Sequence, residues 1–210
     1  MRCFRDKGFD ETTMRDIARE AEVSLGNAYH YFPSKNAIVA AYYDVQQDRH
    51  EKLALGRMAE VTDLRERLGI AFHTKIDAVR KDRRLLIAVS RSLADPSDPL
   101  SAFSEESRAV RERAIGIFEA ALDVPVVLPE RRRLLATTLW GLHLASLAYL
   151  VRDESRGQRK TRALIDGALD LAVPLLLVSQ MPGLEATWQQ LGRVLADADL
   201  LVGRPAASPE

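Results

Sequence analysis

Hydrophobic and polar positions near the start of this chain follow the spacing of an amphipathic helix. Between residues 13 and 21 the apolar side chains recur at i, i+3, i+4 and i+7, which places them on one helical face. These side chains are Met14, Ile17, Ala18 and Ala21. Thr13 is a suitable N-cap, and an acidic residue three positions later, Asp16, completes a capping-box pattern. We therefore expect a short helix that begins at Thr13.

The next segment has a different pattern, because most of its side chains are left for solvent. A turn over residues 21–23 leads to Ser24, a second N-cap candidate, and to a helix over residues 25–31. Three positions are expected to face the core: Val23, Ala28 and Phe32. Two tyrosines and a histidine remain on the outside of this helix. Such a helix is typical of a helix-turn-helix that presents its second helix to the major groove of DNA.

The rest of the chain predicts one helix after another, so the expected fold class is all-α. No stretch shows the sustained alternation of a strand. Prolines mark expected breaks at Pro96 and Pro125, a helix start at Pro129 and a kink at Pro174. The expected helices cover residues 34–58, 63–80, 83–93, 99–122, 129–153, 158–178 and 183–200. We expect a DNA-binding head over residues 1–45, a helical body over 46–203 and a disordered tail over 204–210.

Residues 134–151 contain no Asp, Glu, Lys or Arg, so a membrane helix has to be considered. Polar residues such as Thr137, His143 and Ser146, together with charged flanks, instead favour a helix buried in a large core. A second apolar helix over 164–178 carries Asp166 and Asp170 on one side. The two helices suit an antiparallel pair that meets a second copy of itself. We therefore expect a homodimer formed through the helices near 130–153 and 158–178, and no membrane partner.

Composition excludes some classes of function and leaves DNA binding to be argued from the motif. The 210 residues carry a net charge of +0, which favours neither a membrane surface nor a polyanion. A single cysteine, Cys3, permits no internal disulfide, and no signal peptide is visible, so a cytoplasmic location is expected. Residues 1–44 hold six basic and seven acidic side chains. The basic surface usual in nucleic-acid binding is therefore absent from the head.

Short groups of residues between positions 8 and 35 form a specific pattern. They are Gly8-Phe9, Thr12-Thr13, Ile17-Ala18, Val23-Ser24, Gly26, Tyr29, Tyr31-Phe32 and Ser34-Lys35. This pattern resembles the DNA-binding domain of the TetR (tetracycline-repressor-like) family of transcriptional regulators. Residues 153–158 are similar to the loop before the last dimer helix of many such regulators. The chain departs from the family in a first helix that we expect to be truncated, in Glu22 at a common glycine position, and in Asn36 and Ala37 after the lysine.

The resemblance implies a set of DNA contacts made by the head of a dimer on a palindromic operator. Phosphate contacts, which fix register without reading sequence, fall to Thr13, Tyr29, Tyr31 and Lys35. Base edges are expected to face Leu25, Gly26, Asn27 and His30, with Ser24 beside them at the start of the helix. Asn27 could pair with adenine and Leu25 could touch a thymine methyl. The alternative for the two tyrosines is that they pack on the neighbouring helix.

The resemblance also implies that a small molecule binds within the body and changes the separation of the two heads. The candidate pocket residues are aromatic or of mixed character: Phe72, His73, Ile76, Phe103, Phe118, Trp140, His143 and Leu144. Trp140 and His143 share a helical face. The alternative for each is ordinary core packing, with the two histidines hydrogen-bonded in the core. The sequence does not identify the effector.

Enzymatic chemistry has no support in the sequence. The four histidines are scattered without the spacing of a metal site, and there is no glycine-rich phosphate loop. We expect no catalytic residue, no metal and no cofactor. The expected function is a homodimeric, ligand-responsive DNA-binding regulator, a repressor rather than an activator. The alternatives are an α-helical small-molecule binding protein that has lost DNA affinity and, more remotely, a helical protein-binding adaptor.

Overall fold

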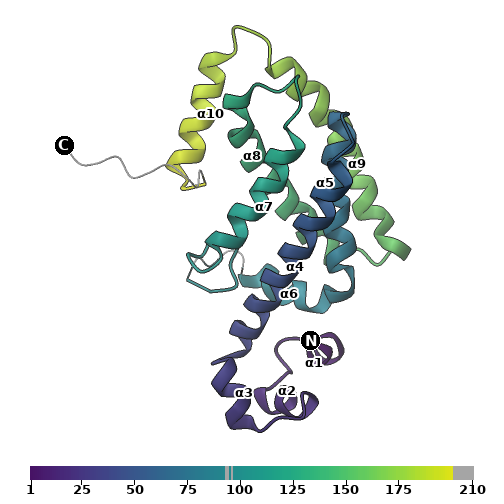
Figure 1. Ribbon diagram of the computed structural model, residues 1–210, viewed down its shortest axis with the longest axis vertical. Coiled ribbons are helices and arrows are strands. Elements are labelled where there is room, and N and C mark those ends of the chain that lie inside the picture. Colours follow the sequence, from purple (N-terminus) through teal and green to yellow (C-terminus); the bar gives the residue numbers. More distant parts are fainter. Residues whose placement is uncertain (93–94, 96, 201–210) are drawn as a thin grey trace, which may run out of the picture.

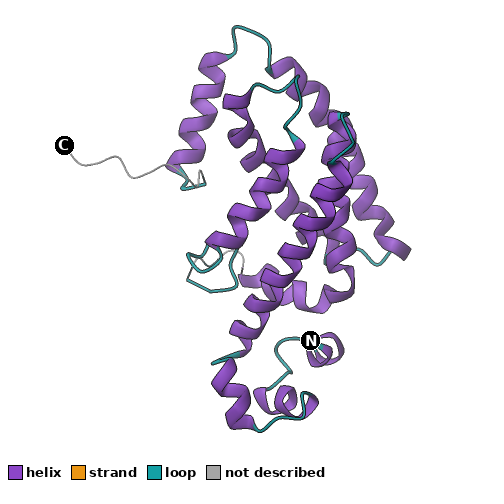
Figure 2. Cartoon of the chain, in the orientation of Figure 1, coloured by secondary structure: helices purple, strands orange, loops and turns teal. Residues whose placement is uncertain are grey.

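The computed structural model of the chain describes residues 1–92, 95 and 97–200, and confirms the all-α class. Helices account for 74% of the structure, and the described part contains no strand (Figure 2). The end of the helix expected at 83–93, the last residues of the expected body and the tail expected at 204–210 lie outside the described residues. No described helix combines the length and the apolar character needed to cross a membrane.

The head is made of three short helices at one end of the molecule (Figure 1). They are α1 (Arg2–Lys7), α2 (Met14–Glu20) and α3 (Leu25–Tyr31). The expected capping box at Thr13 is present: its hydroxyl accepts from the Asp16 amide, and the Asp16 carboxylate accepts from the Thr13 amide, both at 3.1 Å. Glu22, which occupies a position where glycine is common, has a left-handed backbone conformation with φ of 55°. The start of α2 and the turn after it therefore follow from local capping and turn residues.

The body consists of longer helices whose bounds follow most of the predicted ranges. They are α4 (Lys35–Met58), α5 (Leu64–Val79), the 3₁₀ turn η1 (Arg80–Asp82), α6 (Arg83–Ser92), α7 (Arg108–Ala121), α8 (Pro129–Leu150), the 3₁₀ turn η2 (Arg156–Gln158), α9 (Arg159–Ser179) and α10 (Glu185–Asp197). The helix α9 continues through Pro174. The main core lies among α4, α5, α7, α8 and α9, with Phe72 and Phe118 in edge-to-face contact at its centre.

The helix expected at 99–122 is wrong at its start, because α7 begins only at Arg108. The residues before it form turns in which polar side chains bond to nearby amides. The Asp98 carboxylate accepts from the Leu100 amide, and the Ser104 hydroxyl accepts from the Ser107 amide. Such local bonds compete with the helical ladder. This turn segment, residues 97–107, forms one wall of the cavity described below.

Besides the continuous chain of α4, polar contacts attach the head to the body. The buried carboxylate of Asp82, in η1, accepts hydrogen bonds from Arg5 Nε of α1 at 2.6 Å and from the Tyr42 hydroxyl of α4. Burial and the Asp82 hydrogen bond raise the pKa of Tyr42 to about 12, so its hydroxyl keeps its proton. On the surface, Arg91 of α6 pairs with Asp10 of the head at 2.8 Å. The head is therefore attached to η1 through Asp82 and to α6 through Arg91.

Arg67 fastens the ends of two helices to α5. Its guanidinium donates to the carbonyl oxygens of Met58 and Val61 at 3.0 and 2.7 Å, just after α4 ends. It also donates to Ala120 and Ala121 at 2.6 and 3.1 Å, at the end of α7. These carbonyl groups have no later turn of helix to satisfy them. The Arg67 side chain therefore holds the end of α4 and the end of α7 against α5.

Arg67→Met should lower the free energy of unfolding by about 2–3 kcal/mol, because it leaves partly buried carbonyl groups without charged donors. Urea denaturation followed by circular dichroism would measure the change. Arg65→Met is a matched control on the same helix. Arg65 only pairs with Asp166 and Asp170 near the surface, so its loss should cost less than about 1 kcal/mol. Equal effects of the two substitutions would contradict the role assigned to Arg67.

Candidate DNA-binding surface and effector pocket

The helix α3 lies in the part of the head that is farthest from the body (Figure 1). The Ser24 hydroxyl caps it by accepting from the Asn27 amide at 3.1 Å. None of the seven described residues of α3 is buried, and Tyr29 and Tyr31 are 50% and 70% exposed. Packing of these tyrosines on a neighbouring helix is therefore disfavoured. The helix carries a surface of polar and aromatic groups that nothing in the described chain covers.

The inward positions expected around α3 are partly wrong. Val23 and Phe32 are 39% and 36% exposed, and only Ala28 is half-buried. The physical reason is the size of the head, because a three-helix unit with a two-turn helix at its edge has little interior to offer. The fully buried side chains of the head, Phe4 and Thr12, lie before α2 instead.

Lys35 makes contacts within the protein that the sequence did not suggest. Its ammonium donates to the Phe9 carbonyl at 2.8 Å and lies over the Phe9 ring, 4.5 Å from the centroid. The contact joins the loop after α1 to the start of α4. Thr13 is similarly engaged, since its hydroxyl donates to the Asp16 carboxylate at 2.7 Å. Among the expected phosphate contacts, these two therefore also stabilise the head itself.

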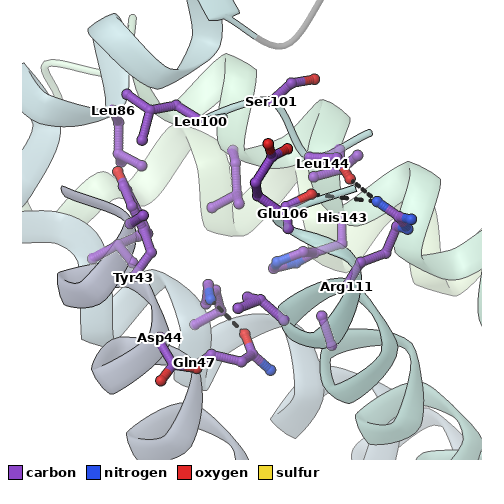
Figure 3. Close-up of a pocket in the computed structure, with 18 of the residues that line it drawn as sticks. Tyr43, Asp44, Gln47, Leu86, Leu100, Ser101, Glu106, Arg111, His143 and Leu144 are labelled. Atoms are coloured by element: carbon purple, nitrogen blue, oxygen red, sulfur yellow. Dashed lines mark hydrogen bonds between the residues drawn. The ribbon is translucent and has the colours of Figure 1, made fainter. Parts of the chain in front are cut away.

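A cavity of about 400 Å³ lies in the body, among α4, α5, α6, the 97–107 turn segment, α7 and α8 (Figure 3). Its walls are mostly apolar, with side chains such as Val79, Leu86, Leu100, Leu144 and Leu147. Some polar groups, Gln47, Lys75 and His143 among them, lie where α4 and α5 meet α8, and others, such as Glu106 and Arg111, lie on the 97–107 turn segment and α7. Concave apolar sites of this size with a few polar groups are typical binding sites for small molecules.

The structure separates the eight candidate pocket residues into different environments. Trp140, His143 and Leu144 of α8 line the cavity. Phe72, Ile76 and Phe118 are buried in the core, where the two phenyl rings hold the His143 ring at 5.7 and 5.6 Å between centroids. They support the site without lining it.

His73 and Phe103 are not among the described residues that line this cavity. His73 points toward α9, where its Nε2 lies 2.9 Å from the Asp166 carboxylate. Phe103 is 40% exposed and packs edge-on against the outer side of Trp140, so it is absent from the lining of the main cavity as described. The reason on α5 is helical rotation. Positions 72 and 76 face the core and 73 faces α9, whereas 75 and 79 face the cavity.

Sequence reasoning missed the polar pair of the cavity lining formed by Gln47 and Lys75, and also Tyr43. The Lys75 ammonium donates to Gln47 Oε1 at 2.9 Å, and Lys75 is only 8% exposed (Figure 3). Burial lowers the pKa of Lys75 to about 8. The available signal was the spacing of Ala71, Lys75 and Val79 at i, i+4 and i+8, which placed a lysine on an apolar stripe.

Two buried histidines, His143 in the cavity lining and His50 stacked on it, are neutral in this environment. His50 and His143 stack at 6.3 Å, and His50 Nε2 bonds to the Ala71 carbonyl at 2.9 Å. Burial, with the nearby Lys75 charge, lowers the pKa of His50 to about 3 and that of His143 well below its ordinary value. In the described structure, the buried atoms His143 Nδ1, Gln47 Nε2 and Tyr43 Oη have no hydrogen-bond partner.

An exposed helix-turn-helix joined by one long helix to a larger helical body defines a class of protein, the helix-turn-helix transcriptional regulators. Residues 1–42 match the family model for bacterial regulatory proteins of the tetR family. Residues 67–187 match that for the tetracyclin repressor-like C-terminal domain. The chain belongs to the TetR family of transcriptional regulators.

Two known proteins are similar to this chain in different ways. The crystal structure of PfmR, a TetR family transcriptional regulator from Thermus thermophilus, superposes with a TM-score of 0.55 and 19% identity. That match covers 80% of this chain and 93% of PfmR and supports the shared fold. The uncharacterized HTH-type transcriptional regulator YuxN of Bacillus subtilis (strain 168) is 40% identical over 48 residues, or 21% of this chain. The chain spans only 16% of the length of YuxN in that match.

Lys75→Met should raise the free energy of unfolding at pH 7 by about 2 kcal/mol, because it removes a charge that burial disfavours. Below pH 8 Lys75 is charged in both states, so its full cost is present. As pH rises from about 8 to about 10.4, the folded chain loses this proton before the unfolded chain does, and the cost disappears. The gain should therefore shrink toward zero at about pH 10.5 in urea titrations. Lys52→Met, at an exposed position on α4, is the control, and a destabilised Lys75→Met variant would contradict the expectation.

Proposed function

We propose that this chain is a ligand-responsive transcriptional repressor that binds a palindromic operator as a homodimer and is released by a small molecule. The observation that carries the proposal is that the exposed helix-turn-helix and the cavity share one continuous helix. The start of α4 holds the head through Lys35, and its middle supplies Tyr43 and Gln47 to the cavity. A molecule in the cavity therefore acts on the same helix that carries the head.

The exposed groups of α3 suit the division of labour expected at an operator. Tyr29, Tyr31 and Lys35, with Thr13 at the start of α2, would hold phosphates, while Leu25, Gly26, Asn27 and His30 would meet base edges beside Ser24. Gly26 supports this orientation, because a Cβ added there would meet no atom of the protein within 4 Å. The fold itself does not require glycine at this position, whereas close approach to a base pair would favour it.

Coupling between cavity and head would run through the junction of α5 and α6. Leu86 and Ser90 of α6 line the cavity, and Asp82 directly before α6 bonds to Arg5 of the head and Tyr42 of α4. A ligand that shifts α6 relative to α4 would disturb this buried carboxylate and with it the orientation of the head. The affinity for DNA would then fall by the difference in ligand binding free energy between the two states.

Dimerisation is supported by an apolar stripe on the outer face of α9. Leu164, Leu171, Leu175 and Val178 follow helical spacing and are between 49% and 73% exposed. Leu142 and Tyr149 of α8 are exposed as well. Large exposed apolar surfaces on a helical pair mark protein contacts. A second copy of the chain would cover this stripe and place two α3 helices on one face of the DNA.

The second candidate function is a small-molecule binding protein without DNA affinity. It is favoured by the slight excess of acidic over basic side chains in the head. Selection of bound duplexes from a random DNA pool at low salt, using the purified chain, separates the two functions. Enrichment of a palindrome is expected. If no sequence is enriched while a small ligand still binds, the regulator function is wrong for this chain.

Asn27→Ala should change sequence preference at one base pair of each half-site by about 1–3 kcal/mol, because a base-reading amide is lost. Tyr31→Phe should instead weaken binding to all sequences alike, because a phosphate contact carries no sequence information. Competition binding to the selected operator and its single-base variants measures both effects. Uniform weakening by Asn27→Ala would show that Asn27 does not read a base.

Introducing glutamates at Leu171 and Leu175 together should convert the dimer into a monomer, since two charges would be buried against their symmetry mates. Light scattering after size-exclusion chromatography gives the mass, and operator affinity should fall with it. Val45→Glu is a matched control, because Val45 is 61% exposed on α4, outside this stripe. A double variant that stays dimeric would place the interface elsewhere.

A further inference from the structure

We infer that the cavity takes an amphipathic organic anion with a single carboxylate, whose charge pairs with Lys75 and whose apolar part lies against α6, α7 and α8. The inference rests on the proposed function in that it names the chemical class of the effector. It is carried by the charge, the hydrogen-bonding groups and the walls of the cavity.

Lys75 is a buried cation without a counter-charge. Its ammonium bonds to Gln47, and among the described residues no carboxylate lies within ion-pair distance of it. The acids at the cavity rim do not serve, because Asp44 pairs with Arg113 and Glu106 is exposed. The neighbouring histidines are neutral, and the Arg113 charge adds to the positive potential at Lys75. Buried charges in proteins are normally paired with a group of opposite sign.

Lys75 and Gln47 present hydrogen-bond donors that lack an acceptor. The ammonium has three protons and gives one to Gln47. The Gln47 amide nitrogen is buried without a partner in the described structure. A carboxylate offers two oxygens with about four acceptor positions and no proton of its own. It matches this donor set, whereas a ligand ammonium would add a second positive charge.

The rest of the cavity limits the ligand to one small charged group. Arg111 also lines the cavity, but its Nη1 donates to the Ala102 carbonyl at 2.7 Å and to the Ser107 hydroxyl at 3.3 Å (Figure 3). The same nitrogen donates to the Ser104 carbonyl at 3.1 Å. A diphosphate would need more cations than Lys75 alone. Opposite Lys75 the walls are Leu86, Leu144 and Leu147, which suit hydrocarbon.

The test is isothermal titration of the purified chain, without DNA, against carboxylates of graded size. The probes are straight-chain carboxylates from hexanoate to tetradecanoate below their micellar concentrations, and naphthoate, each beside its primary alcohol and primary amine. At least one carboxylate should bind tenfold or more tightly than its alcohol, and its amine should bind more weakly still. If no carboxylate exceeds its alcohol, the inference is overturned.

Variants at Lys75 locate the charge. Lys75→Met and Lys75→Gln should each lower carboxylate affinity tenfold or more and leave alcohol affinity within twofold, while Lys52→Met changes neither. Two variants guard against one that fails to fold, which circular dichroism would reveal. Retained carboxylate selectivity in a folded Lys75 variant would overturn the assignment to this cavity.

Operator release is measured separately, so that the two proposals can fail independently. If a carboxylate binds through Lys75 but leaves an operator complex intact, the inference stands and the effector part of the proposed function is wrong. If the chain binds no DNA at all, the titrations still decide the chemistry of the cavity.

Discussion

One unbroken helix, α4, sets the relation between the two halves of this molecule. Its 24 residues span about 36 Å, from the Ser34 cap in the head to the ends of α5 and α7 in the body. Because a helix transmits displacement along its axis as a rigid element, the head has little freedom to move independently of the cavity wall. The buried Asp82 carboxylate strengthens this constraint, since it bonds to the head and to α4 at once.

The body carries buried polar groups that a purely structural core would avoid. Lys75, Gln47 and His143 are each less than a tenth exposed, and burying a charged or polar group costs free energy. Their position on one side of an apolar cavity gives a reason for their presence, because a binding site needs groups that orient a ligand. Stability and recognition are in conflict at Lys75, whose pKa of about 8 reflects the cost of its burial.

Particular residues show where reasoning from the sequence succeeded and where it stopped. The caps at Thr13 and Ser24 are recognisable as local signals, and the helices begin beside them. The start of α7 was placed nine residues too early, because serine and aspartate side chains form turns over 99–107 where a helix was expected. Of the candidate pocket residues, Trp140, His143 and Leu144 line the cavity, whereas Phe72, Ile76 and Phe118 are buried in the core.

The sequence by itself determined the helical class, the capped helix-turn-helix of the head and the family to which the chain belongs, because spacing, caps and turn residues act over a few neighbouring positions. Only the tertiary structure decided which face of α5 meets the cavity, and therefore that Lys75, and not His73, lies beside it. That choice depends on how α5 is rotated against α4, α8 and α9. Such rotation follows from packing between residues far apart in the chain. The i, i+4 and i+8 spacing around Lys75 marks one face of α5 but does not say which neighbour that face meets.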